Sequence, residues 1–169
     1  IALGDAMDVV SEEKRSYIMS RIRGRDTKPE MMVRSALHGL GFRFTVRGPR
    51  NRMLPGRPDL VFPSRRTVLF VHGCFWHGHE NCRDFRLPAS RVDYWQTKIE
   101  GNRERDRANY EQLQRSGWRI IVVWACAVVR KGSRKAAMAA IADELQNGER
   151  PFVEFGDTSG EGFTRKTRC

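Results

Sequence analysis

The sequence predicts an α/β domain with a mixed central sheet and helices on its faces. Segments with helical periodicity and short β-rich runs follow one another in the order helix, helix, three strands, helix, strand, helix. Residues 119–124 form a continuous apolar run, which is typical of a strand buried on both faces. The 169 residues are enough for one such domain with its own core.

The N-terminal part is predicted to hold two helices. Ser11 is a suitable N-cap for a short helix over residues 11–23. Thr27 and Glu30 have the spacing of a capping box, so a second helix should begin there. Gly41 is placed to end that helix.

Three short strands should follow. Residues 43–47 alternate between polar and apolar side chains and predict a strand. Residues 48–56 are rich in Gly, Pro and Arg and predict a loop. The runs 58–62 and 67–72 are separated by a turn at 63–66, which predicts a hairpin.

The second half is predicted to contain a long helix over residues 92–116, the buried strand 119–124 and a last helix over 133–146. Gly117 is placed to stop the long helix. Residues 150–169 are Gly-rich and polar, so we expect a loosely packed tail.

These elements divide the chain into an N-terminal extension or cloning remnant (1–10), a single domain (11–149) and the tail (150–169). No apolar run of 18 residues is present, which excludes a membrane span of the usual length. The N-terminus lacks the pattern of a secretion signal, so the four cysteines are expected to be reduced.

Positive charge is concentrated near the N-terminus. The net charge is +11, and residues 14–57 hold 12 Lys or Arg against only Asp26 and Glu30. The rest of the chain is nearly balanced, with 19 basic and 18 acidic residues. A concentrated surplus favours nucleic-acid binding over a generally basic surface.

The long helix carries polar side chains on its apolar stripe, which consists of Trp95, Ile99, Asn102, Asp106, Tyr110 and Leu113. An inward carboxylate is costly unless it is paired or functional. Asp106 therefore either forms a salt bridge with a nearby Arg or belongs to a site, and periodicity leaves both open.

Asp59 precedes one hairpin strand, and residues 70–72 end its partner. Polar groups at these positions would converge on one edge, where oxygen ligands can hold a hard cation. A solvated turn Asp is the alternative.

The loop 72–82 is dense in metal-binding side chains. Cys74, His79 and Cys82 have the spacing Cys-x4-His-x2-Cys, and Cys126 lies just beyond the buried strand. Four closed Cys and His ligands predict a structural zinc site rather than buried thiols. His77 could replace His79 as the histidine ligand, because spacing does not distinguish them.

Large apolar side chains accompany this loop. Phe75 and Trp76 lie at its tip, and Trp95 begins the long helix. In a basic protein such residues can insert between bases, and Met19 and Ile22 could do so from the N-terminal helix. Core packing is the alternative for each of them. The polar loop favours exposure of Phe75 and Trp76.

Four separated motifs carry a family resemblance: LPGRPD at 54–59, FVHGCFWH at 70–77, NRERD at 102–106 and GWRIIVVWAC at 117–126. In this order they resemble the very-short-patch repair (Vsr) DNA mismatch endonucleases. The resemblance runs from about residue 11 to residue 128. It implies a restriction-endonuclease-like fold with a structural zinc loop. It also implies strand-specific, Mg²⁺-dependent nicking of duplex DNA 5′ of the T in a T·G mismatch, which arises from deaminated 5-methylcytosine.

The resemblance also implies roles for individual residues. Asp59 and the backbone carbonyl of Val71 would bind catalytic Mg²⁺, of which there would be two. Glu30 and Asp106 would lie around the metal-bound waters. His77, oriented by Asp106, would be the general base, and His72 would contact the scissile phosphate.

Zinc would be held by Cys74, His79, Cys82 and Cys126, although this chain has one extra residue between His79 and Cys82. The DNA-binding residues would be Phe75, Trp76, Trp95, Met19, Ile22 and Asn102. The implied partners are mismatched duplex DNA, a mismatch-repair matchmaker protein and a repair DNA polymerase.

The expected setting is a monomer in a bacterial cytoplasm, associated with the nucleoid and not with a membrane. Two alternatives stay open: a restriction-like nuclease that cuts matched DNA, and a non-catalytic zinc-stapled DNA-binding module.

Overall fold

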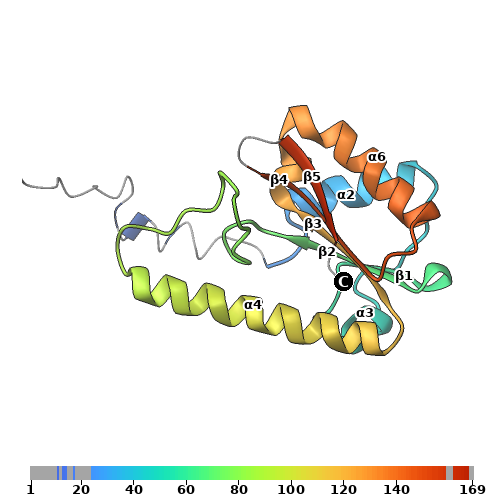
Figure 1. The fold of residues 1–169 in the computed structure, drawn as a ribbon, viewed down its shortest axis with the longest axis horizontal. Coiled ribbons are helices and arrows are strands. Elements are labelled where there is room, and N and C mark those ends of the chain that lie inside the picture. Colours follow the sequence, from blue (N-terminus) through green and yellow to red (C-terminus); the bar gives the residue numbers. More distant parts are fainter. Residues whose placement is uncertain (1–10, 12, 15–16, 18–23, 159–161, 168–169) are drawn as a thin grey trace, which may run out of the picture.

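The computed structural model describes residues 11, 13–14, 17, 24–158 and 162–167 (Figure 1). A five-stranded sheet in the order β1-β2-β3-β4-β5 forms its centre. The strands are β1 (Leu60–Phe62), β2 (Thr67–His72), β3 (Arg119–Trp124), β4 (Phe152–Thr158) and β5 (Gly162–Thr167). The three central strands are parallel and the two edge strands antiparallel, so the predicted mixed α/β fold is confirmed.

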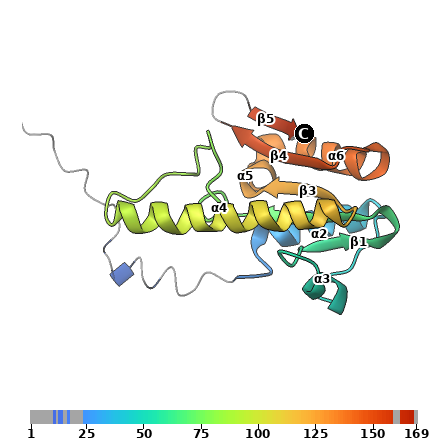
Figure 2. The same cartoon turned by 60° about the horizontal axis from the view of Figure 1, so that its bottom comes forward.

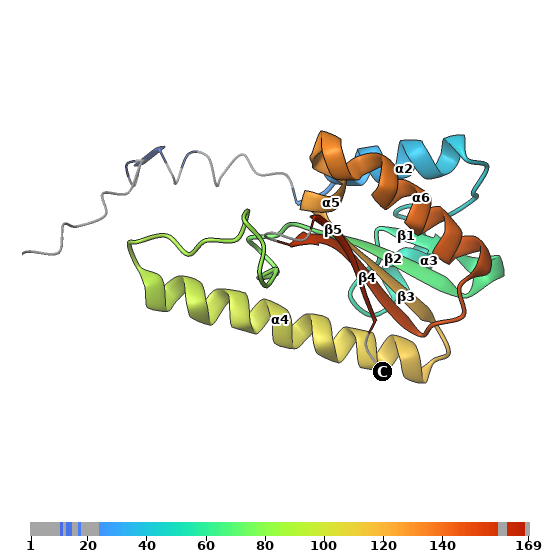
Figure 3. The same cartoon turned by 45° about the horizontal axis from the view of Figure 1, so that its top comes forward.

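Helices cover both faces of this sheet. They are α2 (Lys28–Gly39), α3 (Pro49–Met53), α4 (Val92–Arg115), α5 (Ala125–Val129) and α6 (Lys131–Asn147). The long helix α4 runs across one face (Figure 2), while α2 and α6 lie on the other (Figure 3). Within the described residues, no helix combines the length and the apolar character that crossing a bilayer requires.

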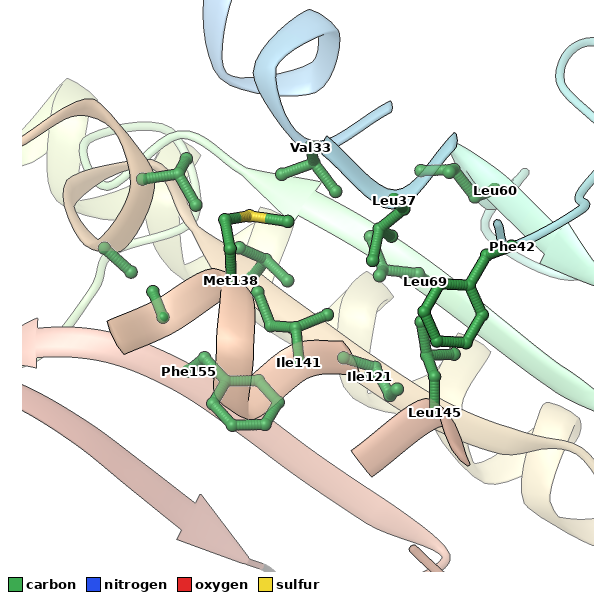
Figure 4. Close-up of a cluster of buried hydrophobic side chains, with 14 of the residues drawn as sticks. Val33, Leu37, Phe42, Leu60, Leu69, Ile121, Met138, Ile141, Leu145 and Phe155 are labelled. Atoms are coloured by element: carbon green, nitrogen blue, oxygen red, sulfur yellow. The ribbon is translucent and has the colours of Figure 1, made fainter. Parts of the chain in front are cut away.

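Strand alternation divides the core into two clusters. On the α2 and α6 side, Leu69 and Ile121 pack against Val33, Ile141 and other buried side chains (Figure 4). On the α4 side the buried side chains include Val68, Phe70, Val122 and Leu113. Successive side chains of β2 thus point to opposite faces, and His72 falls on the face that α4 covers.

The predicted helix signals agree with the structure. The side chain of Thr27 accepts a hydrogen bond from the Glu30 backbone N–H, which is the N-cap half of a capping box, while the Glu30 carboxylate accepts from the backbone N–H of Asp26. Gly41 and Gly117 follow α2 and α4 with φ of +90° and +75°, a conformation that glycine adopts most readily. Ser11 Oγ accepts a hydrogen bond from Lys14 N, but most of the predicted first helix lies outside the described residues.

Three expectations do not hold. Residues 48–56 are not an uninterrupted loop, because Pro49–Met53 form the short helix α3 with a proline in its first turn. The segment from residue 150 is not a loosely packed tail, because β4 pairs with β3 and buries Phe152, Val153 and Phe155. Residues 43–47 do not form a full strand. Only Thr45 makes an isolated bridge, to Val61.

Candidate active site and metal centre

The hairpin β1–β2 places Asp59 beside the end of β2. Leu60 pairs with Leu69, so Asp59 lies one residue further along the ladder. Its Oδ2 accepts a hydrogen bond from the Val71 backbone N–H at 2.7 Å. The predicted convergence of these two chain segments is therefore found.

His72 ends β2 and is buried beneath α4. Its Nε2 lies 2.5 Å from the Tyr110 hydroxyl and 3.9 Å from Oδ2 of Asp106. Burial, and then the neighbouring His77, lower the pKa of His72 well below its usual value. A neutral imidazole can donate one hydrogen bond and accept another, but it brings no positive charge to a phosphate.

His77 also contacts helix α4 directly. Its Nδ1 lies 2.6 Å from Oδ2 of Asp106, and its ring stacks on His72 with centroids 3.8 Å apart. An ionised carboxylate only accepts hydrogen bonds, so Nδ1 carries the proton and Nε2 is the basic nitrogen. Asp106 thus points inward because it holds His77, and not because it pairs with a nearby Arg.

A cleft of about 590 Å³ joins these groups to Glu30, and its walls include Glu30, Asp59, Val71, His72 and His77. Glu30 comes from the first turn of α2. Its carboxylate accepts hydrogen bonds from the Thr27 hydroxyl (2.9 Å) and the Asp26 backbone N–H (2.8 Å). Arg34 pairs with the same carboxylate at 3.2 Å. Glu30 therefore caps its helix while facing the cleft.

Asp59 is destabilised as an anion in this cleft. Burial raises the pKa of Asp59 to about 6. The hydrogen bond from the Val71 N–H favours the charged form and opposes this rise. The nearby Glu30 adds to the rise, while Arg34 and His77 oppose it. A bound cation would offset this electrostatic penalty, so the two carboxylates fit a site for a hard metal ion.

The second constellation consists of four buried side chains, Cys74, His79, Cys82 and Cys126. One ligand atom of each lies within 4.8 Å of the others, a spread that suits bonds of about 2.3 Å to sulfur and about 2.0 Å to nitrogen. Hydrogen bonds, first from Cys74 and then from His79, lower the pKa of Cys126 to about 4, which favours the thiolate that a metal requires. This closed Cys₃His set is consistent with a structural zinc site.

His77 and His79 are separated by one glycine and face different sites. Gly78 has φ of +63°. A Cβ atom there would lie 2.5 Å from Nε of Arg103 and 2.7 Å from Cγ2 of Ile99. The turn at Gly78 therefore directs His77 to Asp106 and His79 to the cysteines, which resolves the choice that spacing left open.

Arg130 joins two residues that support the cysteine cluster. The backbone N–H groups of Asp84 and Asp157 donate to the sulfurs of Cys82 (3.4 Å) and Cys126 (3.3 Å). Both carboxylates pair with Arg130, at 2.8 and 2.9 Å. The Arg130 guanidinium thus holds both N–H donors in place, as residues around the direct ligands of a metal site commonly do.

Three aromatic rings form a cluster beside the cleft. The rings of Phe75, Trp76 and Trp95 contact one another edge to face, with centroids 5.3 to 6.0 Å apart. Phe75 and Trp76 are half-buried rather than fully exposed, because Trp95 supports them from below and is itself buried. Asn102 donates to the Trp76 carbonyl at 2.7 Å and so fixes the loop to α4.

Sequence reasoning missed three contributors. Tyr110 was placed on the helical stripe without a role, although its position one turn after Asp106 is a usable signal. Arg34 and Arg130 had no signal, because arginines are abundant in this chain. The predicted contacts of Met19 and Ile22 lie outside the described residues.

Comparison with known proteins identifies the relatives of this chain. The family model described as DNA mismatch endonuclease Vsr matches residues 7–83. The type II nicking enzyme V.XorIIP of Xanthomonas oryzae pv. oryzae is 51% identical over 136 residues, covering 80% of this chain and 97% of the relative. The DNA mismatch endonuclease Vsr of Escherichia coli is 42% identical over 139 residues, covering 82% and 85%.

A third relative, the type II nicking enzyme V.NmeAIP of Neisseria meningitidis, is 37% identical over 140 residues, covering 83% of this chain and 97% of the relative. The fold, the site and these relatives define a DNA nicking endonuclease. The chain belongs to the Vsr DNA mismatch endonuclease family.

Proposed function

We propose that this endonuclease nicks duplex DNA on the 5′ side of the T in a T·G mismatch by Mg²⁺-dependent hydrolysis. The observation that carries this proposal is a single cleft that holds Asp59 together with His77, whose Asp106 partner lies behind it. Phosphate binding alone would favour Lys or Arg over such carboxylates and imidazoles. The E. coli relative is named as a mismatch endonuclease, which supports the mismatch as substrate.

Asp59 and the Val71 carbonyl would hold the metal, and Glu30 would bind its waters. Mg²⁺ prefers oxygen ligands, and the raised pKa of Asp59 reflects a negative charge that a cation would stabilise. When bound, two such ions stabilise charge on the attacking and leaving oxygens of a phosphodiester. Arg34 keeps the Glu30 carboxylate in position at the cleft.

His77 is the proposed general base. Asp106 fixes its tautomer, so that Nε2 can take the proton of the attacking water. His72 is neutral and buried, and its contribution at the phosphate is therefore a hydrogen bond and not a charge. The products would be a 3′-hydroxyl and a 5′-phosphate.

Mismatch selection would depend on the aromatic cluster. Phe75 and Trp76 are partly exposed and are supported by Trp95, an arrangement that suits a wedge between bases. A mismatched pair unstacks at lower cost than a matched one, so wedge insertion favours damaged sites. Asn102 would help by holding this loop, with Met19 and Ile22 acting from the opposite side.

Zinc would hold the loop that carries both His77 and the wedge. In this proposal the protein acts as a monomer on mismatched DNA. A matchmaker protein of mismatch repair and a repair DNA polymerase would act with it.

A nicking assay tests the proposal. Labelled duplexes with T·G, T·A and other mismatches are incubated with and without Mg²⁺, and the cut position is mapped. We expect a single nick in the T strand of the T·G duplex, only with Mg²⁺. Equal cutting of T·A would instead identify a sequence-specific nicking enzyme, and binding without nicking a DNA-binding module.

A further inference from the structure

A second cavity lies behind the stacked histidines. Its volume is about 240 Å³, and His72 and His77 line both this cavity and the Asp59 cleft. Asp106 and Tyr110 line only the rear cavity. The stacked imidazoles of His72 and His77 therefore lie between the two cavities. The proposed mechanism uses only the side of these rings that faces Asp59.

The rear face brings together three metal-ligating groups. One ligand atom each from His72, His77 and Asp106 lies within 4.8 Å of the others. Oδ2 of Asp106 is 2.6 Å from Nδ1 of His77 and 3.9 Å from Nε2 of His72. Two imidazoles and one carboxylate suit Ni²⁺, Co²⁺ or Zn²⁺, whereas Mg²⁺ prefers oxygen ligands alone.

We propose that His72, His77 and Asp106 form an inhibitory site for a divalent transition-metal ion, distinct from the Mg²⁺ site at Asp59. Besides the ligand Asp106, the walls of the rear cavity carry three acidic and three basic side chains, namely Glu80, Glu100, Glu154, Arg103, Arg107 and Lys166. These surrounding charges are balanced, so the three ligand groups themselves, and not a general negative surface, select the cation.

Occupancy of this site would block the proposed base, and this step rests on the proposed function. In the active form, the Nδ1–H group of His77 donates a hydrogen bond to Asp106, and the free electron pair of the ring is on Nε2. An ion bound to Nδ1 takes the electron pair of that atom, and the ring proton moves through solvent to Nε2. The neutral ring then has no basic nitrogen facing the cleft.

Tyr110 offers an internal test of the geometry, because its hydroxyl lies 2.5 Å from the same Nε2 atom of His72 that the ion would need. The phenol and the ion compete for one nitrogen. Tyr110→Phe is therefore expected to bind Ni²⁺ several-fold more tightly. Weaker binding by this variant would contradict the assigned ligand atom.

Direct binding of Ni²⁺ to the zinc-loaded protein tests the site without reference to activity. Calorimetry should find one Ni²⁺ per chain, and Asp106→Asn and His77→Ala should each weaken it about tenfold or more. His38→Ala removes an exposed histidine on α2 and is the matched control, with unchanged affinity. No bound Ni²⁺, or equal affinity in Asp106→Asn, would overturn the proposal.

A kinetic measurement tests the inhibition. Ni²⁺ should slow nicking with a potency that a tenfold rise in Mg²⁺ leaves unchanged, because the two ions bind at different residues. Relief by Mg²⁺ would place the inhibitory ion at Asp59 and refute the rear site. If wild-type protein does not nick at all, the proposed function fails, while the calorimetry still decides whether the metal site exists.

Discussion

Nδ1 of His77 lies 2.6 Å from Oδ2 of Asp106, although 29 residues separate them in the chain. The contact exists because the chain turns at Gly78, between His77 and the cysteine cluster, while α4 presents Asp106 to the inner side of this loop. It determines which imidazole nitrogen can accept a proton. The proposed chemistry therefore depends on a residue that does not face the substrate cleft.

Asp106→Asn tests this positioning role. The amide can no longer stabilise an imidazolium and can favour the wrong tautomer of His77, so kcat should fall by about 10²–10⁴-fold. Affinity for T·G duplex should stay within about twofold, since Asp106 does not line the Asp59 cleft. Single-turnover nicking measures the effect on the chemical step, and a DNA-binding titration measures the effect on affinity. Asp93→Asn, an exposed carboxylate in the first turn of the same helix, should behave as wild type.

Asp59 should make stability depend on pH. Its pKa is raised from 3.8 to about 6 in the folded chain, so its stabilising contribution is complete below about pH 4 and is lost as the pH rises through 6. Without added Mg²⁺, Asp59→Asn should therefore be more stable than wild type at pH 7.5, by on the order of 1–3 kcal/mol.

Urea unfolding of both proteins at pH 5 and pH 7.5 checks this prediction. The gain should fall to about half at pH 5, which lies roughly midway between the unfolded and folded pKa values of this carboxyl, and Mg²⁺ should stabilise only the wild type. Equal stability of the two proteins at pH 7.5 would show that burial does not perturb Asp59.

The aromatic cluster should control discrimination more than chemistry. Phe75→Ala together with Trp76→Ala removes the two partly exposed rings, and we expect the preference for T·G over T·A duplex to fall by about tenfold or more. Competition binding with both duplexes provides the measurement. Leu40→Ala, an exposed apolar residue at the end of α2, is the control. Unchanged discrimination would count against the wedge.

Arg130 should govern retention of the structural metal. Arg130→Gln loosens both aspartates whose N–H groups contact the cysteine sulfurs, so zinc affinity should fall by about 10–100-fold. Zinc release to a chromogenic chelator gives the readout. Arg115→Gln removes an exposed arginine of α4 that pairs with Glu111 on the same helix, and should release zinc at the wild-type rate. Equal zinc release from both variants would show that the ion pairs of Arg130 are dispensable for zinc retention.

Much of this architecture follows from local sequence signals. The Thr27 N-cap, the glycines after α2 and α4 and the apolar run of β3 are short-range features that the structure reproduces. The four cysteine and histidine ligands could also be anticipated, because three lie in one loop and the fourth follows a strand that ends nearby.

Other features depend on tertiary contacts that no local pattern encodes. Strand β4 lies in a Gly-rich segment, and it forms because β3 offers an unpaired edge. The assignment of His79 to the cysteine cluster depends on the left-handed turn at Gly78, which spacing does not specify. Arg130 was hidden among many arginines, since its value comes from two aspartates distant in the chain.

The most direct test of the proposed active site is the separation of nicking from binding in Asp59→Ala. The account predicts no detectable nick in T·G duplex at any Mg²⁺ concentration, with mismatch affinity close to that of wild type. A purified Asp59→Ala protein that still nicks the T strand would contradict the assignment of this cleft as the hydrolytic site.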